Sequence, residues 1–335
     1  MREIKMKNDP SSGFQPPSPA RGEGKLNPPR PLREREKFRN EVRVSEIWVR
    51  GKKEIKVKCP AKINLTLEVL NKRQDGFHNI QSVMQTIDLF DFLTIKIEEN
   101  CKFEIKLSGT SDQIPYDESN LVYKAILLFV EHTNLHPHKI SVFIEKNIPV
   151  SAGLAGGSTD AAGTLWGLNK IFSDVLSKEE LHKLCAKLGS DLNFCLEGGC
   201  QLATGRGEIL ERLPFQEFCL ALIKPKNLGI SAKEAYTKFS QLKVKPNLNM
   251  SAKLIAALKS GENIVPFLHN DLETALIGDY AQLLEIKKLY PKTIMSGSGS
   301  AFFAIGERIS AQDKFWAKNA LKSINYGIAE VQSSS

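Results

Sequence analysis

The sequence has no long apolar run, and this excludes the commonest kind of membrane protein. No stretch of its 335 residues approaches the roughly 18–20 consecutive apolar residues that a membrane-spanning helix needs. Residues 1–7 are not followed by the hydrophobic core of a signal peptide. With 41% hydrophobic and 25% charged residues, the composition is that of a soluble globular protein. We therefore expect a cytoplasmic protein.

The sequence also lacks the cysteine patterns of metal sites and disulfide frameworks. Its six cysteines form no Cys-x-x-Cys pair, and no histidine follows them at the spacing of zinc ligands. We expect reduced, mostly buried thiols. The residues concerned are Cys59, Cys101, Cys185, Cys195, Cys200 and Cys219.

The net charge of +8 is unevenly distributed. The first 50 residues hold 12 Lys and Arg against 7 Asp and Glu, and seven of the sixteen prolines, so the remaining 285 residues carry only +3. A polar, proline-rich segment buries too little apolar surface to offset the ordering of its backbone. We expect residues 1–50 to be a disordered basic extension. Seven acidic residues argue against a transit peptide, and an upstream translation start would explain the segment equally well.

The most informative stretch is the glycine-rich loop at residues 149–160, Pro-Val-Ser-Ala-Gly-Leu-Ala-Gly-Gly-Ser-Thr-Asp. An alternating run at 140–145 predicts a strand before it, and residues 161–172 have apolar residues at helical spacing. Ser158 or Thr159 is a candidate N-cap. Free N–H groups at such a helix N-terminus attract phosphate. No Lys follows the glycines as in the Walker A pattern. A tight turn with close helix packing is the alternative, but the loop is richer in small residues than a turn needs. We favour a nucleotide-phosphate site.

Two other segments carry polar residues that need an explanation. In an alternating strand over residues 59–70, Lys62, Asn64 and Thr66 share one face, and a solvated strand face is the simplest interpretation. The strand leads into a turn at 71–76, where Asp-Gly is the clearest signal, and then into Phe77 and His78. Considered by themselves, both of these could be ordinary structural residues.

Other elements are predicted from local patterns. Ser177 and Glu180 form a capping box before a helix over 178–188. Asp191 opens an otherwise apolar stretch and, considered alone, is best explained as a helix cap. Further expectations are strands at 41–58, 80–97, 101–107 and 219–225, a turn at 204–208, helices at 121–132, 231–239, 251–260, 280–289 and 313–323, and a second Gly/Ser loop running into a strand at 295–305.

Several of these segments, in this order, resemble the GHMP kinase superfamily. They are Pro-Ala-Lys-Ile-Asn-Leu at 60–65, the loop at 149–162 and Met-Ser-Gly-Ser-Gly-Ser-Ala at 295–301. Asp-Gly-Phe-His at 75–78, Leu-Gly-Ser-Asp at 188–191 and Ala-Thr-Gly-Arg-Gly-Glu at 203–208 narrow the resemblance. With them the chain resembles the members that phosphorylate a cytidine diphosphate-linked methylerythritol. The resemblance covers roughly residues 52–330.

The resemblance implies an α+β fold with two domains and a substrate cleft between them. We expect an N-terminal domain of the ribosomal S5 domain 2 type over residues 51–215 and a ferredoxin-like C-terminal domain over 216–332. It also implies transfer of the ATP γ-phosphate, with Mg²⁺, to the 2-hydroxyl of the methylerythritol unit, a step of non-mevalonate isoprenoid precursor biosynthesis.

The resemblance also assigns roles to particular residues. Asp191 matches the catalytic base and Lys62 the catalytic lysine, while Asn64 and His78 match residues that contact the acceptor. Phe77 matches an aromatic residue that stacks on cytosine. Many members have Tyr at this position, and many have Pro two residues after the base, where this chain has Asn193.

For ATP, we expect contacts from the glycine-rich loop and a contribution of Ser158 to Mg²⁺ binding. Asp160 is left out, because a carboxylate facing ATP would repel it. The second Gly/Ser loop could simply buttress the first. The residues expected to bind ATP are Pro149, Val150, Ser151, Ala152, Gly153, Leu154, Ala155, Gly156, Gly157, Ser158 and Thr159.

Two alternatives remain. Another small alcohol, such as mevalonate or homoserine, could be the acceptor, although an aromatic residue at 77 favours an acceptor with a nucleobase. An RNA-binding module, dependent on residues 1–50 and on low salt, is disfavoured by the nearly balanced charge of the remaining chain. We expect a small-molecule substrate, no nucleic acid or membrane partner, and a monomer or homodimer.

Overall fold

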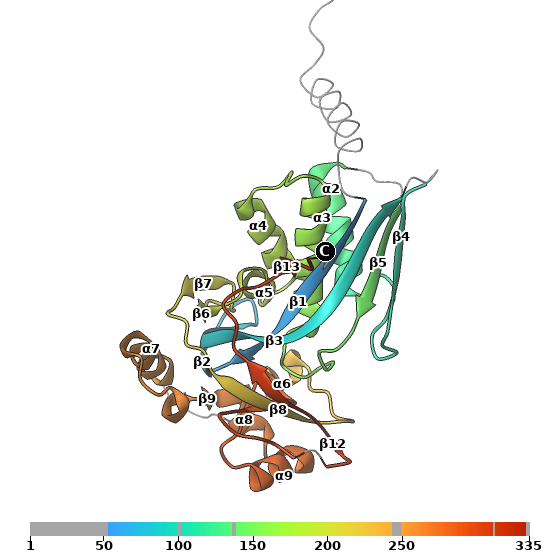
Figure 1. The fold of residues 1–335 in the computed structure, drawn as a ribbon. Coiled ribbons are helices and arrows are strands. Elements are labelled where there is room, and N and C mark those ends of the chain that lie inside the picture. Colours follow the sequence, from blue (N-terminus) through green and yellow to red (C-terminus); the bar gives the residue numbers. More distant parts are fainter. Residues whose placement is uncertain (1–52, 99–101, 136–138, 243–248, 311, 333–335) are drawn as a thin grey trace, which may run out of the picture. The chain divides into compact units, whose positions relative to one another are not determined.

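A computed structural model describes residues 53–98, 102–135, 139–242, 249–310 and 312–332 (Figure 1). The expected extension at 1–50 and most of the expected strand at 41–58 lie outside these residues. The described strands are β1 (Glu54–Asn64), β2 (Thr66–Lys72), β3 (His78–Glu98), β4 (Glu104–Gly109), β5 (Lys139–Glu145), β6 (Cys200–Thr204), β7 (Ile209–Arg212), β8 (Cys219–Pro225), β9 (His269–Asn270), β10 (Ile294–Met295), β11 (Phe302–Ile305), β12 (Phe315–Lys322) and β13 (Ala329–Glu330).

The described helices come mostly in runs between groups of strands, and most of the strand pairs are antiparallel, so the fold is α+β, as predicted. They are α2 (Leu121–Thr133), α3 (Gly156–Ile171), α4 (Lys178–Leu188), α5 (Leu192–Glu197), α6 (Ala232–Gln241), α7 (Met250–Ser260), α8 (Asp271–Leu276) and α9 (Ala281–Leu289), with a short 3₁₀ helix at Val265–Phe267. Among the described residues, no helix combines the length and the apolar character needed to cross a bilayer.

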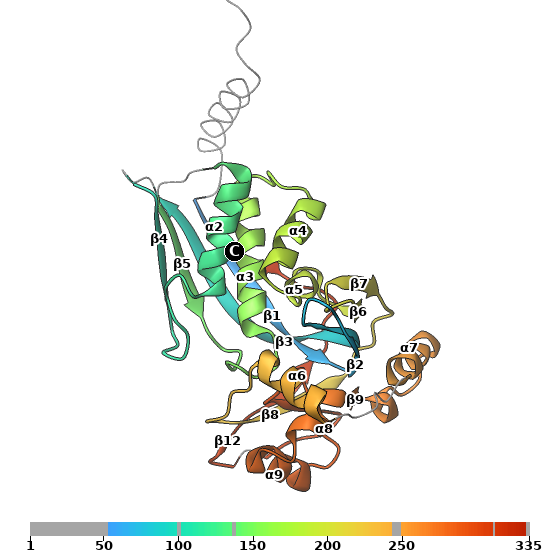
Figure 2. The same cartoon turned by 180° about the vertical axis from the view of Figure 1, so that it is seen from behind.

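The larger sheet is organised around β3. Within the described residues it has nine strands, and β3 pairs with β1, β2, β5 and β6. Side chains of β1 and β3 alternate toward a core formed with helices α2 and α3. Figures 1 and 2 show α2, α3 and α4 together on one face of this sheet. The loop that opens α3 is therefore held against the end of the sheet.

The smaller sheet has the order β10-β11-β8-β12, and helices α6, α8 and α9 contribute to its core. The two sheets are not isolated from each other. Ile63 and Leu65 from the first sheet share a buried cluster with Leu222 and Phe303 from the second. In addition, β9 pairs with β2 and β13 pairs with β1. Strands from beyond residue 215 thus complete the larger sheet, while the division at 215/216 stays a prediction.

Most of the locally signalled elements are confirmed. The expected helices over 121–132, 178–188, 231–239, 251–260 and 280–289 correspond to α2, α4, α6, α7 and α9, and the strand over 219–225 is β8. Ser177 and Glu180 form the predicted capping box. The single strand expected over 59–70 is wrong in detail, because the chain breaks at Leu65 between β1 and β2.

The helix expected over 313–323 is wrong, because residues 315–322 form strand β12. This strand pairs antiparallel with β8, with Trp316 opposite Lys224 and Ala317 opposite Ile223. Phe315 and Leu321 are buried against the sheet. The edge of β8 offers unpaired backbone groups to this segment, and tertiary pairing of this kind overrides local helix propensity.

Candidate active site

The glycine-rich loop enters α3 earlier than predicted. The helix begins at Gly156, and Ala155 is its N-cap, so the expectation of Ser158 or Thr159 as the cap is wrong. Ala155 and Ser151 have φ values of 59° and 50°, which are uncommon for residues with a side chain. Ala155 offers no side-chain hydrogen bond to the helix. The N–H groups of the first turn are thus left for a ligand.

The second Gly/Ser loop packs directly against the first. Ser296 Oγ donates a hydrogen bond to the Gly153 carbonyl over 3.0 Å, and Ala301 N donates to the Ala152 carbonyl over 3.1 Å. Gly153 has a φ of +73°, and a Cβ there would lie 2.0 Å from the Ser296 carbonyl oxygen. Only glycine fits this contact. The loop at 295–301 therefore supports the backbone of the glycine-rich loop.

Lys62 and Asp191 form an ion pair, with 3.3 Å between Nζ and Oδ2. The Lys62 side chain is 4% exposed and that of Asp191 30%. Lys62 also donates to Asn64 Oδ1 over 2.7 Å, and Asn64 Nδ2 donates to Ser82 Oγ over 2.8 Å. The solvated strand face considered for Lys62, Asn64 and Thr66 is therefore wrong, since all three are buried. A buried chain of hydrogen bonds fixes the ammonium beside the carboxylate.

Asp191 lies at the N-cap position of α5, but its side chain makes no capping hydrogen bond. The capping role considered from the sequence is thus wrong. Gly207, in the turn at 204–208, passes close to this residue: a Cβ on Gly207 would lie 3.9 Å from Asp191 Oδ1. The carboxylate keeps one oxygen toward Lys62 and retains a partly exposed surface.

Phe77 and His78 lie in a separate aromatic group. The Phe77 side chain is 53% exposed, and the Arg206 guanidinium carbon lies 5.2 Å from the centre of its ring. His78 stacks on Tyr236, with 5.6 Å between ring centres and an interplanar angle of 17°, and its Nε2 lies 3.1 Å from Ser240 Oγ. Burial lowers the pKa of His78, and the nearby Lys72 lowers it further. The ring is thus biased toward its neutral form.

A cavity of about 1250 Å³ joins these groups. Its lining includes Lys62, Asn64, Phe77, His78, Asp191 and every residue from Pro149 to Ser158. Thr159 is fully buried and does not contribute to this lining. Uncapped backbone N–H groups at a helix N-terminus, a carboxylate–ammonium pair and an aromatic surface therefore line one cavity, an arrangement that would suit a phosphate transfer between two substrates.

Sequence reasoning missed three residues of the aromatic group. Tyr236 and Ser240 lie on or near the helix predicted for 231–239, and Arg206 lies within the Thr-Gly-Arg-Gly-Glu turn. The arginine inside a motif already singled out was a usable signal. For Tyr236 and Ser240 no local signal existed, because they meet His78 only through the packing of α6 near β3.

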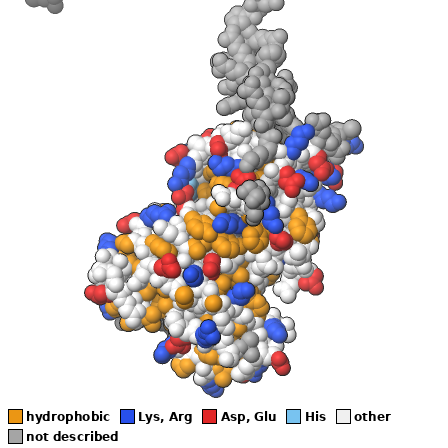
Figure 3. Space-filling model, in the orientation of Figure 1, with side chains coloured by type: hydrophobic (Ala, Val, Ile, Leu, Met, Phe, Trp, Pro, Cys, Tyr) orange, Lys and Arg blue, Asp and Glu red, His pale blue; other side chains and the backbone are white. Residues whose placement is uncertain are grey.

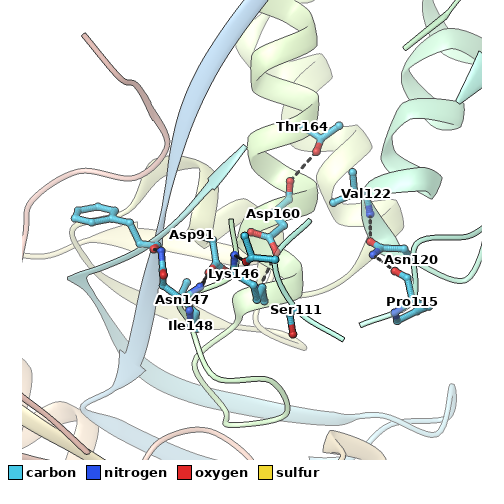
Figure 4. A network of polar contacts seen from close by, with 12 residues as sticks. Asp91, Ser111, Pro115, Asn120, Val122, Lys146, Asn147, Ile148, Asp160 and Thr164 are labelled. Atoms are coloured by element: carbon cyan, nitrogen blue, oxygen red, sulfur yellow. Dashed lines mark hydrogen bonds and ion pairs between the residues drawn. The ribbon is translucent and has the colours of Figure 1, made fainter. Parts of the chain in front are cut away.

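A buried ionic cluster, formed by Asp91, Lys146 and Asp160, lies beneath the loop (Figure 4). Lys146 Nζ lies 2.7 Å from Asp160 Oδ2 and also bonds to Asp91 Oδ2. Burial raises the pKa of Asp160 to about 7, against the opposing effect of Lys146. Burial lowers the pKa of Lys146, but the two carboxylates outweigh it and the net shift is upward. On the sequence alone, Asp160 was excluded from the phosphate site, and Asp91 and Lys146 were not recognised as residues of the site.

Among the described residues, no group of three or more His, Cys, Asp or Glu side chains is placed so that it could bind a metal ion. The described cysteines Cys59, Cys185, Cys195, Cys200 and Cys219 are free thiols, all of them buried except Cys219.

Comparison with known proteins identifies close relatives. The profile of the GHMP kinases N terminal domain matches residues 120–199. The 4-diphosphocytidyl-2-C-methyl-D-erythritol kinase of Bacillus cereus strain B4264 is 38% identical over 274 residues, which are 79% of this chain and 92% of the relative. The corresponding kinase of Caldicellulosiruptor saccharolyticus is 41% identical over 257 residues, 74% of this chain and 87% of the relative.

The fold agrees with these sequence matches. A crystal structure of 4-(cytidine 5'-diphospho)-2C-methyl-D-erythritol kinase superposes with a TM-score of 0.65 and 28% identity, covering 81% of this chain and 100% of that one. The predicted GHMP kinase fold is thereby confirmed.

Proposed function

We propose a function for this chain, which belongs to the 4-diphosphocytidyl-2-C-methyl-D-erythritol kinase family of GHMP kinases. It is an ATP-dependent kinase of isoprenoid precursor biosynthesis, and its acceptor is 4-diphosphocytidyl-2-C-methyl-D-erythritol. The γ-phosphate of ATP is transferred to the 2-hydroxyl of the methylerythritol unit. The observation that carries this proposal is the 3.3 Å pair of Lys62 and Asp191, which faces the same cavity as the phosphate loop.

The phosphates of ATP bind at the loop and the start of α3. The uncapped N–H groups of the first turn and the positive end of the helix dipole favour the triphosphate there. Phosphate transfer needs positioning and charge stabilisation more than covalent help. The contact with Ser296 supports this role, because it fixes the loop backbone before the nucleotide arrives.

Asp191 accepts the proton of the attacking hydroxyl. A tertiary alcohol is a poor nucleophile near neutral pH, so a carboxylate within hydrogen-bond reach assists as the new bond forms. Lys62 holds this carboxylate by its ammonium and offers positive charge to the phosphoryl group in transfer. Asn64 accepts a hydrogen bond from Lys62 and lines the same cavity, which supports its proposed contact with the acceptor.

Mg²⁺ fits the residues around the loop. The Ser158 hydroxyl lines the cavity in the first turn of α3, and an oxygen donor of this kind suits Mg²⁺, which usually takes few protein ligands beside phosphate oxygens and water. Ser158 would thus hold the ion. When bound, Mg²⁺ neutralises charge on the phosphates of ATP.

The acceptor's cytosine stacks on Phe77, and His78 contacts the acceptor. The exposed ring of Phe77 offers a face for stacking, which is favourable for any nucleobase. The absence of a phenolic hydroxyl, compared with Tyr, leaves this stacking surface intact. Homoserine or mevalonate would leave it unused, so the aromatic group favours the cytidine-bearing acceptor.

The RNA-binding alternative has little support on the face of the molecule that Figure 3 shows. Lys and Arg are interspersed with Asp and Glu on the face shown in Figure 3, whereas nucleic-acid binding favours a continuous basic patch. A cytoplasmic location and a monomeric or homodimeric state remain predictions.

An ATP-consumption assay with one acceptor per reaction tests the proposal. The purified protein is given ATP and Mg²⁺ with 4-diphosphocytidyl-methylerythritol, free methylerythritol, mevalonate or homoserine. Turnover with the cytidylyl compound alone is the expected result. Turnover with mevalonate or homoserine would show that the proposed acceptor is wrong. If none of the compounds is phosphorylated, the kinase assignment is rejected.

A further inference from the structure

The buried ionic cluster links two paired strands to the helix that packs on them. Asp91 belongs to β3, Lys146 directly follows β5, and Asp160 is the fifth residue of α3, just past its first turn (Figure 4). The side chains are between 0 and 5% exposed. Burying three charges is costly, so a cluster of this kind is weak evidence for stability by itself. Its position relative to the phosphate loop suggests another role.

The cluster holds both ends of the loop. At the entrance, Asp91 Oδ1 accepts hydrogen bonds from Asn147 N over 2.6 Å and from Ile148 N over 2.8 Å. At the exit, Lys146 lies against the first residue of α3, since a Cβ on Gly156 would be 2.8 Å from its Nζ. Asp160, just past the first turn of the same helix, is joined to this end of the loop by its ion pair with Lys146. The ammonium thus fixes the segment that presents N–H groups to phosphate.

The charges also matter to a bound nucleotide. Lys146 and Asp160 both line the cavity that contains the loop. Two ionised carboxylates so close to the helix N-terminus would repel a triphosphate, and in a buried, weakly screened place this repulsion is strong. Lys146 is the cation that offsets them. Removing it changes the formal charge of the cluster from −1 to −2, and neutralising Asp160 changes it to 0.

We propose that Lys146 is a positioning residue for the nucleotide phosphates, which fixes the loop through Asp91 and Asp160 and cancels their repulsion toward ATP. The inference rests on the proposed function in one respect, namely that the loop binds ATP. It concerns nucleotide binding and does not depend on the acceptor.

Two variants with opposite charge effects test this inference. Dissociation constants of adenosine, AMP, ADP and ATP are measured by calorimetry at constant ionic strength and about pH 8.5, where carboxylates are ionised. For Lys146→Met, affinity falls with each added phosphate, by on the order of tenfold or more for ATP and little for adenosine. For Asp160→Asn, which keeps a hydrogen-bond acceptor for Lys146, the affinity for ATP rises relative to that for adenosine.

Lys224→Met is the matched control. Lys224 is also buried, at 6% exposure, but it donates to the carbonyls of Pro225 and Leu228. Its removal leaves the dependence on nucleotide charge unchanged even if it lowers stability. A merely structural role of Lys146 predicts an equal loss for all four ligands and would overturn the inference, as would an affinity of Asp160→Asn for ATP that does not rise relative to that for adenosine.

Two further outcomes are also decisive. If Lys146→Met does not fold, Asp160→Asn carries the test, because a gain for ATP relative to adenosine is not expected of a structural residue. If the parent binds ATP but phosphorylates none of the acceptors, the proposed function fails. The affinities for adenosine, AMP, ADP and ATP still test the role of Lys146 in that case. A parent that does not bind ATP would overturn both.

Discussion

Asp191 stands at the N-cap position of α5 without capping the helix. An N-cap Asp normally accepts a hydrogen bond from the first turn, which stabilises the helix by about 1 kcal/mol. Asp191 instead pairs with Lys62 and stays partly exposed to the cavity. The side chain is therefore available for a reacting hydroxyl, at the cost of helix stability.

Asp191→Asn is expected to bind ATP with unchanged affinity and to lose turnover by roughly 10²–10⁴-fold, because an amide cannot accept the proton of the acceptor. ADP release gives kcat, and calorimetry gives the affinity. Asp174→Asn is the control: Asp174 is an exposed residue after α3, paired with Lys170, and this variant should retain activity. Full turnover by Asp191→Asn would remove the base assignment.

Gly153 is the second residue whose substitution is informative. Gly153→Ala places a Cβ against the Ser296 carbonyl and strains a backbone at φ +73°. Gly261→Ala, at φ +75° with nothing within 4 Å, has the strain without the contact. We expect a loss of about 1 kcal/mol in free energy of unfolding for Gly261→Ala and about 2–4 kcal/mol for Gly153→Ala.

Urea unfolding gives the free energy of unfolding of both variants. Each variant has the same Gly-to-Ala change, so its effect on the entropy of the unfolded chain cancels when the two are compared. ATP affinity should fall only for Gly153→Ala, because Gly261 ends α7 outside the cavity lining. Equal losses of stability and intact ATP binding would mean that the second loop does not support the first.

At the scale of elements, the junction of α4 and α5 provides a pH-dependent contribution to stability. The hydrogen bond with His182 is the main cause that lowers the pKa of Glu197 to about 2; burial opposes it, and Lys178 adds to the lowering. The folded-state pKa lies below the ordinary 4.5. The folded state is thus favoured above pH 4.5, and this contribution is lost as the pH falls toward 2.

Glu197→Gln should therefore lower the free energy of unfolding at pH 7 by about 1 kcal/mol, a value discounted because the group is partly exposed. The difference from the parent should shrink between pH 4.5 and 2, as followed by urea unfolding at several pH values. Glu307→Gln, in the exposed pair with Lys292, is the control and should change little at any pH. A difference that grows with acidity would contradict the assignment.

Local signals predicted those elements that local interactions determine. The capping box at Ser177 was recognised because its partner lies three residues away, and the glycine-rich loop because its composition is itself the signal. The cluster of Asp91, Lys146 and Asp160 could not be recognised, since Asp91 and Lys146 are 55 positions apart and only the fold brings them together. Strand β12 was missed for the same reason, because its pairing with β8 outweighs its local preference.

At the scale of the whole molecule, the two sheets share buried side chains and exchange strands. Phe303 of the smaller sheet is fully buried in a cluster with Ile63 and Leu65 of the larger one. The pairing of β9 with β2 and of β13 with β1 adds backbone hydrogen bonds between the two parts. Connections of this kind favour cooperative unfolding in one transition. The predicted domains at 51–215 and 216–332 would then not be autonomous.

Phe303→Ala tests this coupling. The substitution should cost about 3–5 kcal/mol, as expected for removing a buried aromatic ring. Trp166 on α3 reports on the part with the larger sheet, and Trp316 on β12 reports on the part with the smaller sheet. Each is observed in a variant that keeps this tryptophan and has Phe in place of the other tryptophans. Both fluorescence transitions should coincide in urea and shift together, because the cavity in the shared cluster weakens both sheets at once.

The control is Phe143→Ala, since Phe143 on β5 is 42% exposed and its loss should change stability by less than about 1 kcal/mol. A shift of the Trp316 transition alone would show that the smaller sheet unfolds by itself. In that case the shared cluster would join two independently stable domains, and the cavity that holds the phosphate loop beside Asp191 would depend on their docking. Coincident transitions mean instead that the residues on either side of the cavity are fixed relative to each other by the same cooperative fold that forms the sheets.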